Sequence, residues 1–154
     1  MRLDFVKAFV NSTTEILGEL IGSEVEVRSM TMTSGPIADR EVITIIGLMG
    51  EVKGDVVFDI DQLTAERLGG HLTGEPSEGM TPLVKSSIAE VASMAIGRAI
   101  SRINDDGTRL RMTPPNIFTD AETITYQDSF ETLVAPITTQ YGEVRISVAI
   151  QDLT

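Results

Sequence analysis

The stretch TPLVKSSIAEVASMAIGRAISRI, residues Thr81–Ile103, predicts a single long helix and decides the fold. Apolar residues recur along it at steps of three and four, so one side of the helix is apolar over its whole length. A continuous apolar side must pack against a core. We therefore expect this helix to contact the core through these residues: Val84, Ile88, Val91, Ala95 and Ala99.

A second side of the same helix carries small or polar residues around one carboxylate: Ser86, Glu90, Ser93 and Gly97. Helix faces in water usually carry long charged side chains, whereas short side chains leave room for another molecule to come close to the backbone. Two explanations remain open. The small residues either admit a neighbouring helix or strand of this chain, or they form a binding face for a partner.

Two further helices precede the central one in the sequence. Residues Leu3–Ile21 carry apolar side chains largely on one helical side, and Gly22 is placed to end that helix. Asp59 and Gln62 resemble a capping pair that opens a second helix over about Asp61–Leu72. The central helix therefore follows two predicted helices and the strands between them.

The remaining apolar stretches alternate with a period of two or consist of β-branched residues, which predicts strands. They predict a bent strand at Glu24–Thr33 and a short strand at Arg109–Met112. They also predict two antiparallel hairpins, formed by Glu41–Met49 with Asp55–Ile60 and by Phe130–Thr138 with Gly142–Gln151. In the last strand, apolar residues alternate with Arg145, Ser147 and Gln151, so we expect one buried face and one face that is at least partly open. We assign no element to Asn116–Asp128.

A faint internal repeat relates the N-terminal helix to the central one. Placing Glu15 over Glu90, an offset of 75 residues, also places Gly22 over Gly97. Strands follow each helix, as duplication of a helix-and-strands unit predicts, although two amphipathic helices can also agree by chance. The predicted fold class is α+β, with long helices packed on a largely antiparallel sheet of about six strands and with pseudo-duplicated halves.

Composition predicts one globular domain over residues 1–154. The 12 Lys and Arg against 23 Asp and Glu give a net charge of −11, so we expect neither nucleic acid nor an anionic membrane as a partner. Cysteine is absent, which excludes a disulfide framework and a thiol nucleophile. The longest apolar run, Val42–Gly50, is too short to span a bilayer, and the N-terminus lacks a secretory pattern. We expect a cytoplasmic protein.

Common catalytic motifs are absent from the sequence, which has no nucleophile elbow, no phosphate-binding loop and no acidic calcium loop. His71 is the only histidine, and without cysteine or a second histidine a metal site is disfavoured. His71 falls in the last turn of a predicted helix, where a cation interacts favourably with the helix dipole. The candidate site is therefore the polar side of the central helix.

The central helix resembles the active helix of the CheC/CheX/FliY family of chemotaxis phosphatases, whose motif is Asp or Ser, three residues, Glu, two residues, Asn. Ser86 and Glu90 match this motif, and Ser93 stands where the family has Asn. Three other segments are similar to family segments in the same order: the helix DFVKAFVNSTTEILGEL, the hairpin GLMGEVKGDVVFDI and the Pro114-Pro115 pair. The chain is identified as a CheX-like member over most of its length.

The resemblance implies a phosphatase that acts on a phosphorylated CheY-type response regulator. In the family, the Glu makes an ion pair with a Lys of the receiver domain, and the Asn positions the attacking water. Glu90 and Ser93 are then the catalytic candidates, and Ser86 and Gly97 complete the partner-binding face. The resemblance implies no cofactor of the chain's own, because the magnesium ion belongs to the partner receiver. It also implies a homodimer formed through the sheets, for which Val144–Ile150 is a candidate edge strand.

Ser93 is the one departure from the family motif. Its side chain is shorter than that of Asn by about one bond, roughly 1.5 Å. A misplacement of about 1 Å costs on the order of a hundredfold in rate. We therefore expect either a slow phosphatase or a non-catalytic module that binds a receiver or forms a dimeric scaffold. Gly18 stands where Glu15 would need its own Asn, so the repeat offers no second site.

Overall fold

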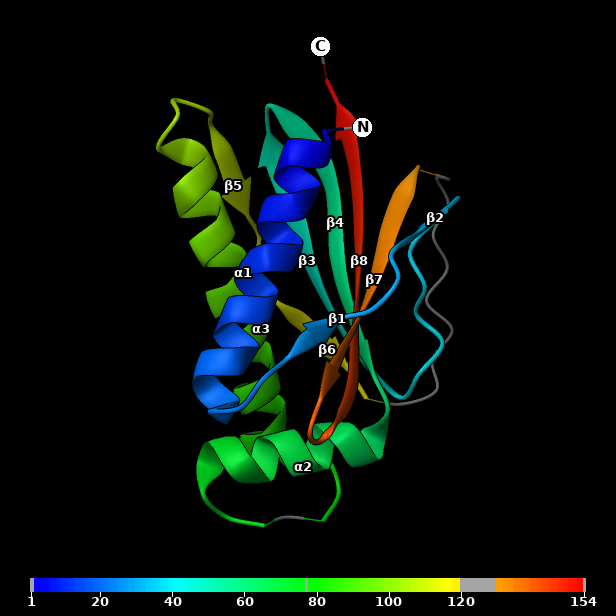
Figure 1. Ribbon diagram of the computed structural model, residues 1–154, viewed down its shortest axis with the longest axis vertical. Helices are drawn as coiled ribbons and strands as arrows, with labels where there is room; N and C mark the ends of the chain where they lie inside the picture. Colours follow the sequence, from blue (N-terminus) through cyan, green and yellow to red (C-terminus); the bar gives the residue numbers. More distant parts are fainter. Residues whose placement is uncertain (1, 77, 120–129, 154) are drawn as a thin grey trace.

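Two long helices lie side by side on one face of an antiparallel sheet in the computed structural model (Figure 1). The structure describes residues 2–76, 78–119 and 130–153, and within these ranges it has three helices and eight strands, which confirms the predicted α+β class. The helices are α1 (Leu3–Ile21), α2 (Gln62–Thr73) and α3 (Pro82–Asn104). α1 and α3 pack along the sheet, and α2 lies across one end of it (Figure 1).

The ends of α1 and α3 follow from local capping. Gly22 adopts a left-handed conformation with φ of 75°, and its N–H donates to the Gly18 carbonyl oxygen at 2.9 Å, which ends α1 as predicted. At the start of α3, the Thr81 hydroxyl oxygen accepts a hydrogen bond from the Val84 N–H at 3.2 Å. None of the helices in the described ranges is both long and apolar enough to cross a membrane.

Eight strands, all paired antiparallel, form the sheet: β1 (Glu26–Val27), β2 (Thr31–Thr33), β3 (Val42–Gly50), β4 (Val52–Ile60), β5 (Leu110–Met112), β6 (Asn116–Phe118), β7 (Thr132–Thr139) and β8 (Gly142–Asp152). The β3–β4 and β7–β8 hairpins are the two that the sequence predicts. The predicted bent strand is split into β1 and β2. β6 was not predicted, because three residues are too few to show an alternating pattern. It lies at the start of Asn116–Asp128, the stretch to which no element was assigned, and residues 120–128 of that stretch lie outside the described ranges.

The two halves of the chain interlock in the sheet, whose strand order is β1-β7-β8-β4-β3-β5. β4 and β8 pair at the centre. β1 and β2 come from the first half and add to β7, whereas β5 and β6 come from the second half and add to β3. Each half therefore contributes one long hairpin and two short strands, arranged symmetrically about the β4–β8 pair. Because β8 lies between β7 and β4, the prediction that Val144–Ile150 forms an edge strand is wrong.

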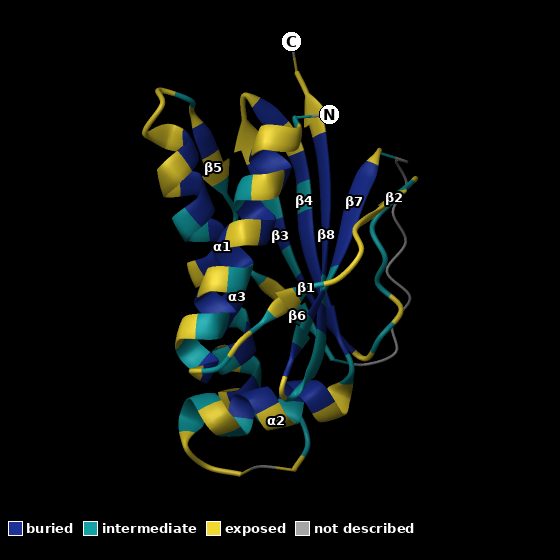
Figure 2. Cartoon of the chain, viewed as in Figure 1, coloured by how far each residue is buried: buried dark blue, intermediate teal, exposed yellow. Residues whose placement is uncertain are grey.

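The core lies between the helices and the sheet. Figure 2 shows buried residues along the central strands and on the inward sides of the helices. α3 contributes the predicted apolar side, all of it buried: Val84, Ile88, Val91, Ala95 and Ala99. The opposite side of α3 is thereby left to face solvent.

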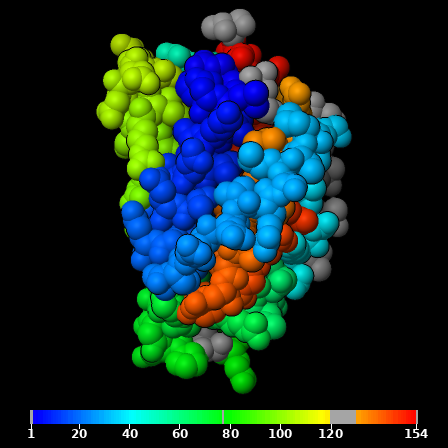
Figure 3. Space-filling model, in the orientation of Figure 1, coloured from blue at the N-terminus to red at the C-terminus, as the bar shows by residue number. Residues whose placement is uncertain are grey.

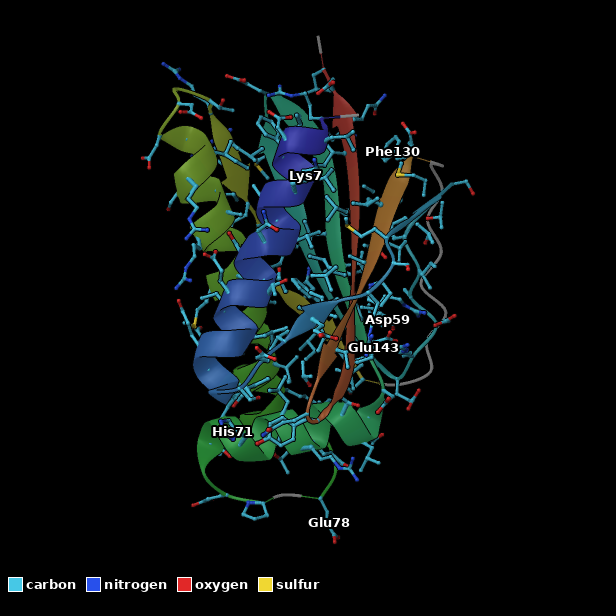
Figure 4. The ribbon with its side chains drawn as sticks, in the orientation of Figure 1. Lys7, Asp59, His71, Glu78, Phe130 and Glu143 are labelled. Carbon is cyan, nitrogen blue, oxygen red and sulfur yellow. The ribbon has the colours of Figure 1, made fainter. Side chains whose placement is uncertain are left out.

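The sheet face away from α1 and α3 carries a charged group, which we call the Asp59 cluster: Asp39, Arg40, Asp59, Glu143 and Arg145. Asp59 on β4 is fully buried, accepts hydrogen bonds from the N–H groups of Asp39 at 3.3 Å and Arg40 at 3.0 Å, and forms an ion pair with Arg145. Arg145 also pairs with Asp39, and Arg40 pairs with Glu143. Figure 4 shows Asp59 and Glu143 close together beside β8, away from α1.

The Asp59 cluster corrects two predictions. Asp59 does not cap α2; the cap is Asp61, whose carboxylate accepts a hydrogen bond from the Thr64 N–H at 2.8 Å. The expectation that this face of β8 is at least partly open holds at the exposed Gln151 and the half-buried Arg145 but is wrong at Ser147, which is fully buried. The segment after β2 covers Ser147, since the Ile37 N–H donates to the Ser147 hydroxyl oxygen at 3.2 Å.

Candidate functional site

The outward side of α3 carries all four residues of the candidate site. Ser86 and Glu90 are exposed, and Ser93 and Gly97 are partly exposed. Steps of three and four residues place them on one face, opposite the buried apolar side. We call this surface the Glu90 face. The structure therefore brings the predicted site residues together and leaves them accessible.

Gly97 is not required by packing within the described part of the chain. Apart from its two chain neighbours and the adjacent backbone of α3, a Cβ atom added at Gly97 would meet no heavy atom within 4 Å. At Gly69 on α2, by contrast, an added Cβ would lie 2.8 Å from Cγ1 of Val84, so that glycine allows α2 and α3 to cross closely. Close packing of a neighbouring helix therefore explains the glycine at position 69 of α2, whereas the first of the two explanations does not account for Gly97 on α3.

Replacing Gly97 by Ala is expected to raise the free energy of unfolding by about 0.8–1 kcal/mol, because Ala is the better helix former and its methyl group enters open space. Gly69→Ala is the matched comparison and is expected to lower it by about 1–3 kcal/mol, because the new methyl group overlaps Val84. Urea unfolding of both variants measures the difference. A loss of stability at Gly97 equal to that at Gly69 would contradict this assignment.

The Glu90 carboxylate forms no ion pair or hydrogen bond with any other residue that the structure describes. Its counterpart in the repeat, Glu15 on α1, is bound by the Arg102 guanidinium, with one of the two contacts at 3.2 Å. Glu19, one turn further along α1, pairs with Arg98 at 2.9 Å and 3.0 Å. The two acids of the repeat thus differ: α1 presents a neutralised carboxylate, and α3 presents one without a cation among the described residues.

The electrostatics of α1 follow from these ion pairs. The hydrogen bond from Arg102 lowers the pKa of Glu15, and the hydrogen bond from Arg98 lowers the pKa of Glu19. The repeat supplies no equivalent arginine for Glu90. The residue 75 positions before Arg102 is Val27, which lies on β1. Glu90 therefore remains available to a cation from outside the chain.

Two residues of the Glu90 face were missed in the sequence analysis. Leu83 is 55% exposed and Met94 is 39% exposed, although both are large and apolar. Leu83 precedes Glu90 by seven residues and Met94 follows it by four, so helical spacing alone would have placed them on the same face. They were overlooked because apolar residues in a helix are first assigned to its buried side.

His71 connects α2 with α1 and with the β7–β8 turn. Its Nε2 lies 3.0 Å from the carbonyl oxygen of Leu20 in α1, and its Nδ1 lies 2.7 Å from the hydroxyl of Tyr141 in the β7–β8 turn. Because a carbonyl only accepts, Nε2 carries a proton, and in the neutral imidazole Nδ1 accepts a hydrogen bond from the Tyr141 hydroxyl. Figures 3 and 4 show this turn seated against α2, where His71 lies. No group of three or more metal-binding side chains occurs in the ranges that the structure describes.

The chain is similar to known proteins both in sequence and in fold. A family model described as chemotaxis phosphatase CheX matches residues 42–138. The CheY-P phosphatase CheX of Thermotoga maritima is 22% identical over 113 residues, which cover 73% of each chain. A CheC-like superfamily protein from Shewanella sp. PV-4 has the same fold, with a TM-score of 0.87, 21% identity, and coverage of 98% of this chain and 99% of that one.

A second solved structure is a complex. It is the CheX–CheY–BeF3–Mg²⁺ complex from Borrelia burgdorferi, whose matching chain has a TM-score of 0.82 and 22% identity. The match covers 98% of this chain and 100% of that one. The predicted CheC/CheX-like fold is confirmed by both structures.

Proposed function

The chain belongs to the family of the chemotaxis phosphatase CheX, and from this premise we propose that it hydrolyses the aspartyl phosphate of a CheY-type response regulator. The family match confirms the resemblance found in the sequence. The Borrelia burgdorferi relative forms a complex with CheY, which supports a CheY-type partner for this chain. The observation that carries the proposal is the position of Glu90: exposed, on the outward side of a long helix, and without a cation among the described residues.

The proposed chemistry requires little from this chain. A receiver domain holds its phosphoryl group beside its own metal ion and a lysine, so most of the charge stabilisation is supplied by the partner. Glu90 binds the ammonium group of that lysine and fixes the orientation of the two proteins. The Ser93 hydroxyl can donate and accept a hydrogen bond, and it holds the attacking water near the phosphorus, about one bond short of where the family Asn would place it. The water oxygen bonds to phosphorus as the bond to the aspartyl oxygen breaks, which yields a free carboxylate and inorganic phosphate.

The test is phosphate release from phosphorylated CheY-type receivers. Glu90→Gln keeps the shape of the side chain and removes its charge, so kcat/KM is expected to fall about tenfold, the loss typical of one charge-assisted hydrogen bond. Glu131→Gln changes another exposed acid, just before β7, and is expected to leave the rate unchanged. Equal rates for wild type and Glu90→Gln would exclude the assigned role of Glu90.

The second candidate function is non-catalytic receiver binding, and Ser93 is the observation that favours it. In that case the receiver binds with the same dependence on Glu90, and no phosphate is released above the rate of the receiver alone. A homodimer remains a prediction, but β8 is not available for it. The described strands instead place the ends of the sheet at β1 with β2 and at β5 with β6.

A further inference from the structure

Two large apolar side chains flank Glu90 on the outward side of α3. Leu83 and Met94 are 55% and 39% exposed. At 100° per residue, they point within about 20° and 40° of the direction of Glu90. The acid therefore lies between two apolar side chains along the same helix face.

Packing within the chain buries only part of the Leu83 and Met94 side chains. A leucine more than half exposed leaves apolar surface in water, which is unfavourable for the isolated chain. The other residues around Glu90 are small: Ser86, Ser93 and Gly97. Their side chains are too short to cover Leu83 or Met94. A protein surface that docks on Glu90 would bury both apolar side chains at the same time.

The repeat supplies an internal comparison. The offset of 75 residues that relates Glu90 to Glu15 places Leu83 over Ala8 and Met94 over Glu19. Ala8 is partly buried against the core, and Glu19 is paired with Arg98. On α1, where Glu15 is paired with an arginine, the equivalent positions therefore carry no exposed apolar pair. On α3, where Glu90 has no cation among the described residues, they do.

We propose that Leu83 and Met94 are the apolar anchors through which the Glu90 face docks a CheY-class receiver domain. The proposal rests on the function proposed above and adds the contact that selects the partner. The receiver must present a cation to Glu90 with apolar surface on both sides of it. The two anchors are about 16 Å apart along the helix axis, which lies within the width of a standard protein interface. The complex of the Borrelia burgdorferi relative with CheY supports this class of partner.

The experiment measures binding to a panel of CheY-class receivers carrying BeF3⁻ and Mg²⁺. Leu83→Ala and Met94→Ala are each expected to raise the Kd about fivefold, the loss from burying roughly half of one apolar side chain. Because the two positions are well separated, the double variant is expected to raise the Kd by the product, about 25-fold. The matched controls are Leu63→Ala on α2, at 54% exposed, and Met49→Ala at the end of β3, at 41% exposed, and neither should change the Kd.

The Glu90→Gln variant separates this inference from the proposed function. If Glu90→Gln weakens binding while Leu83→Ala and Met94→Ala match the controls, the inference is overturned and the proposed function stands. If wild type binds no receiver of the panel, both are overturned. Weaker receiver binding confined to the variants at Leu83, Met94 and Glu90 supports the inference. Urea unfolding checks that these substitutions leave the stability of the protein unchanged.

Discussion

Replacing Ser93 by Asn is expected to increase the rate of phosphate release from a phosphorylated CheY-type receiver by on the order of a hundredfold. The hydroxyl of Ser93 stops about one bond short of the position that an Asn carboxamide reaches from the same Cα. A water held by the shorter side chain lies further from the line of attack, and the orienting hydrogen bond contributes about 3 kcal/mol when it is correctly placed. The gain should appear in kcat, because docking through Glu90 is unchanged.

Ser101→Asn is the matched control for Ser93→Asn. Ser101 is also exposed on α3, eight residues further along, and lies too far from Ser93 to reach the same phosphoryl group. Its substitution should leave the rate at the wild-type value. If Ser93→Asn gives no increase while wild type turns over, the Ser93 hydroxyl already suffices. If wild type and Ser93→Asn both match the receiver alone, the phosphatase proposal is wrong.

Replacing Asp59 by Ala is expected to lower the free energy of unfolding by about 3–5 kcal/mol, since it removes one partner of a buried ion pair. Asp59 is 0% exposed, and the Arg145 side chain that it binds is only 15% exposed. The variant would leave that guanidinium with the exposed Asp39 alone and would leave the N–H groups of Asp39 and Arg40 without their acceptor. Urea unfolding of wild type and variant measures the loss.

Asp106→Ala controls for the loss of an acidic residue as such. Asp106 is exposed in the turn after α3, and its replacement should change stability by less than about 0.5 kcal/mol. A loss below about 1 kcal/mol for Asp59→Ala would contradict the role of the Asp59 cluster. Because the cluster lies on the sheet face away from α3, the folded fraction of Asp59→Ala should keep the receiver affinity of wild type.

The helices and hairpins were predictable because local pattern determines them. The three- and four-residue steps of Thr81–Ile103 led to α3 and to its buried side, and Gly22 ends α1 where its conformational freedom is needed. The four long strands were found from alternation and β-branched residues. Each of these features depends on residues that are close together in the sequence.

The errors arose where distant segments meet. Arg145 and Ser147 alternate with apolar residues, which indicates a solvent-facing side, yet residues 37–40 cover that side. Asp59 stands where a helix cap is expected, but its partner Arg145 is 86 residues away. β8 could not be assigned to the sheet interior from its own pattern, because strand order is set by which strands pair.

The candidate site was predicted in part. Ser86, Glu90, Ser93 and Gly97 were chosen from their spacing and from the family motif, and the structure places all four on one accessible face. The exposure of Leu83 and Met94 was not anticipated. The ion pair of Glu15 with Arg102 also lay beyond the sequence, because 87 residues separate the two and only the packing of α1 on α3 brings them together.

The exchange of short strands between the halves constrains how the polypeptide reaches its final form. Among the strands that the structure describes, β3 obtains its outer neighbours from residues 110–118, and β7 obtains its own from residues 26–33. A nascent chain that has left the ribosome only as far as α2 therefore holds a hairpin with both flanks unpaired, which is the kind of surface that recruits chaperones or aggregates. The sheet cannot be completed until β8 has been translated. The chain is therefore expected to fold late and in one cooperative step, rather than one half after the other.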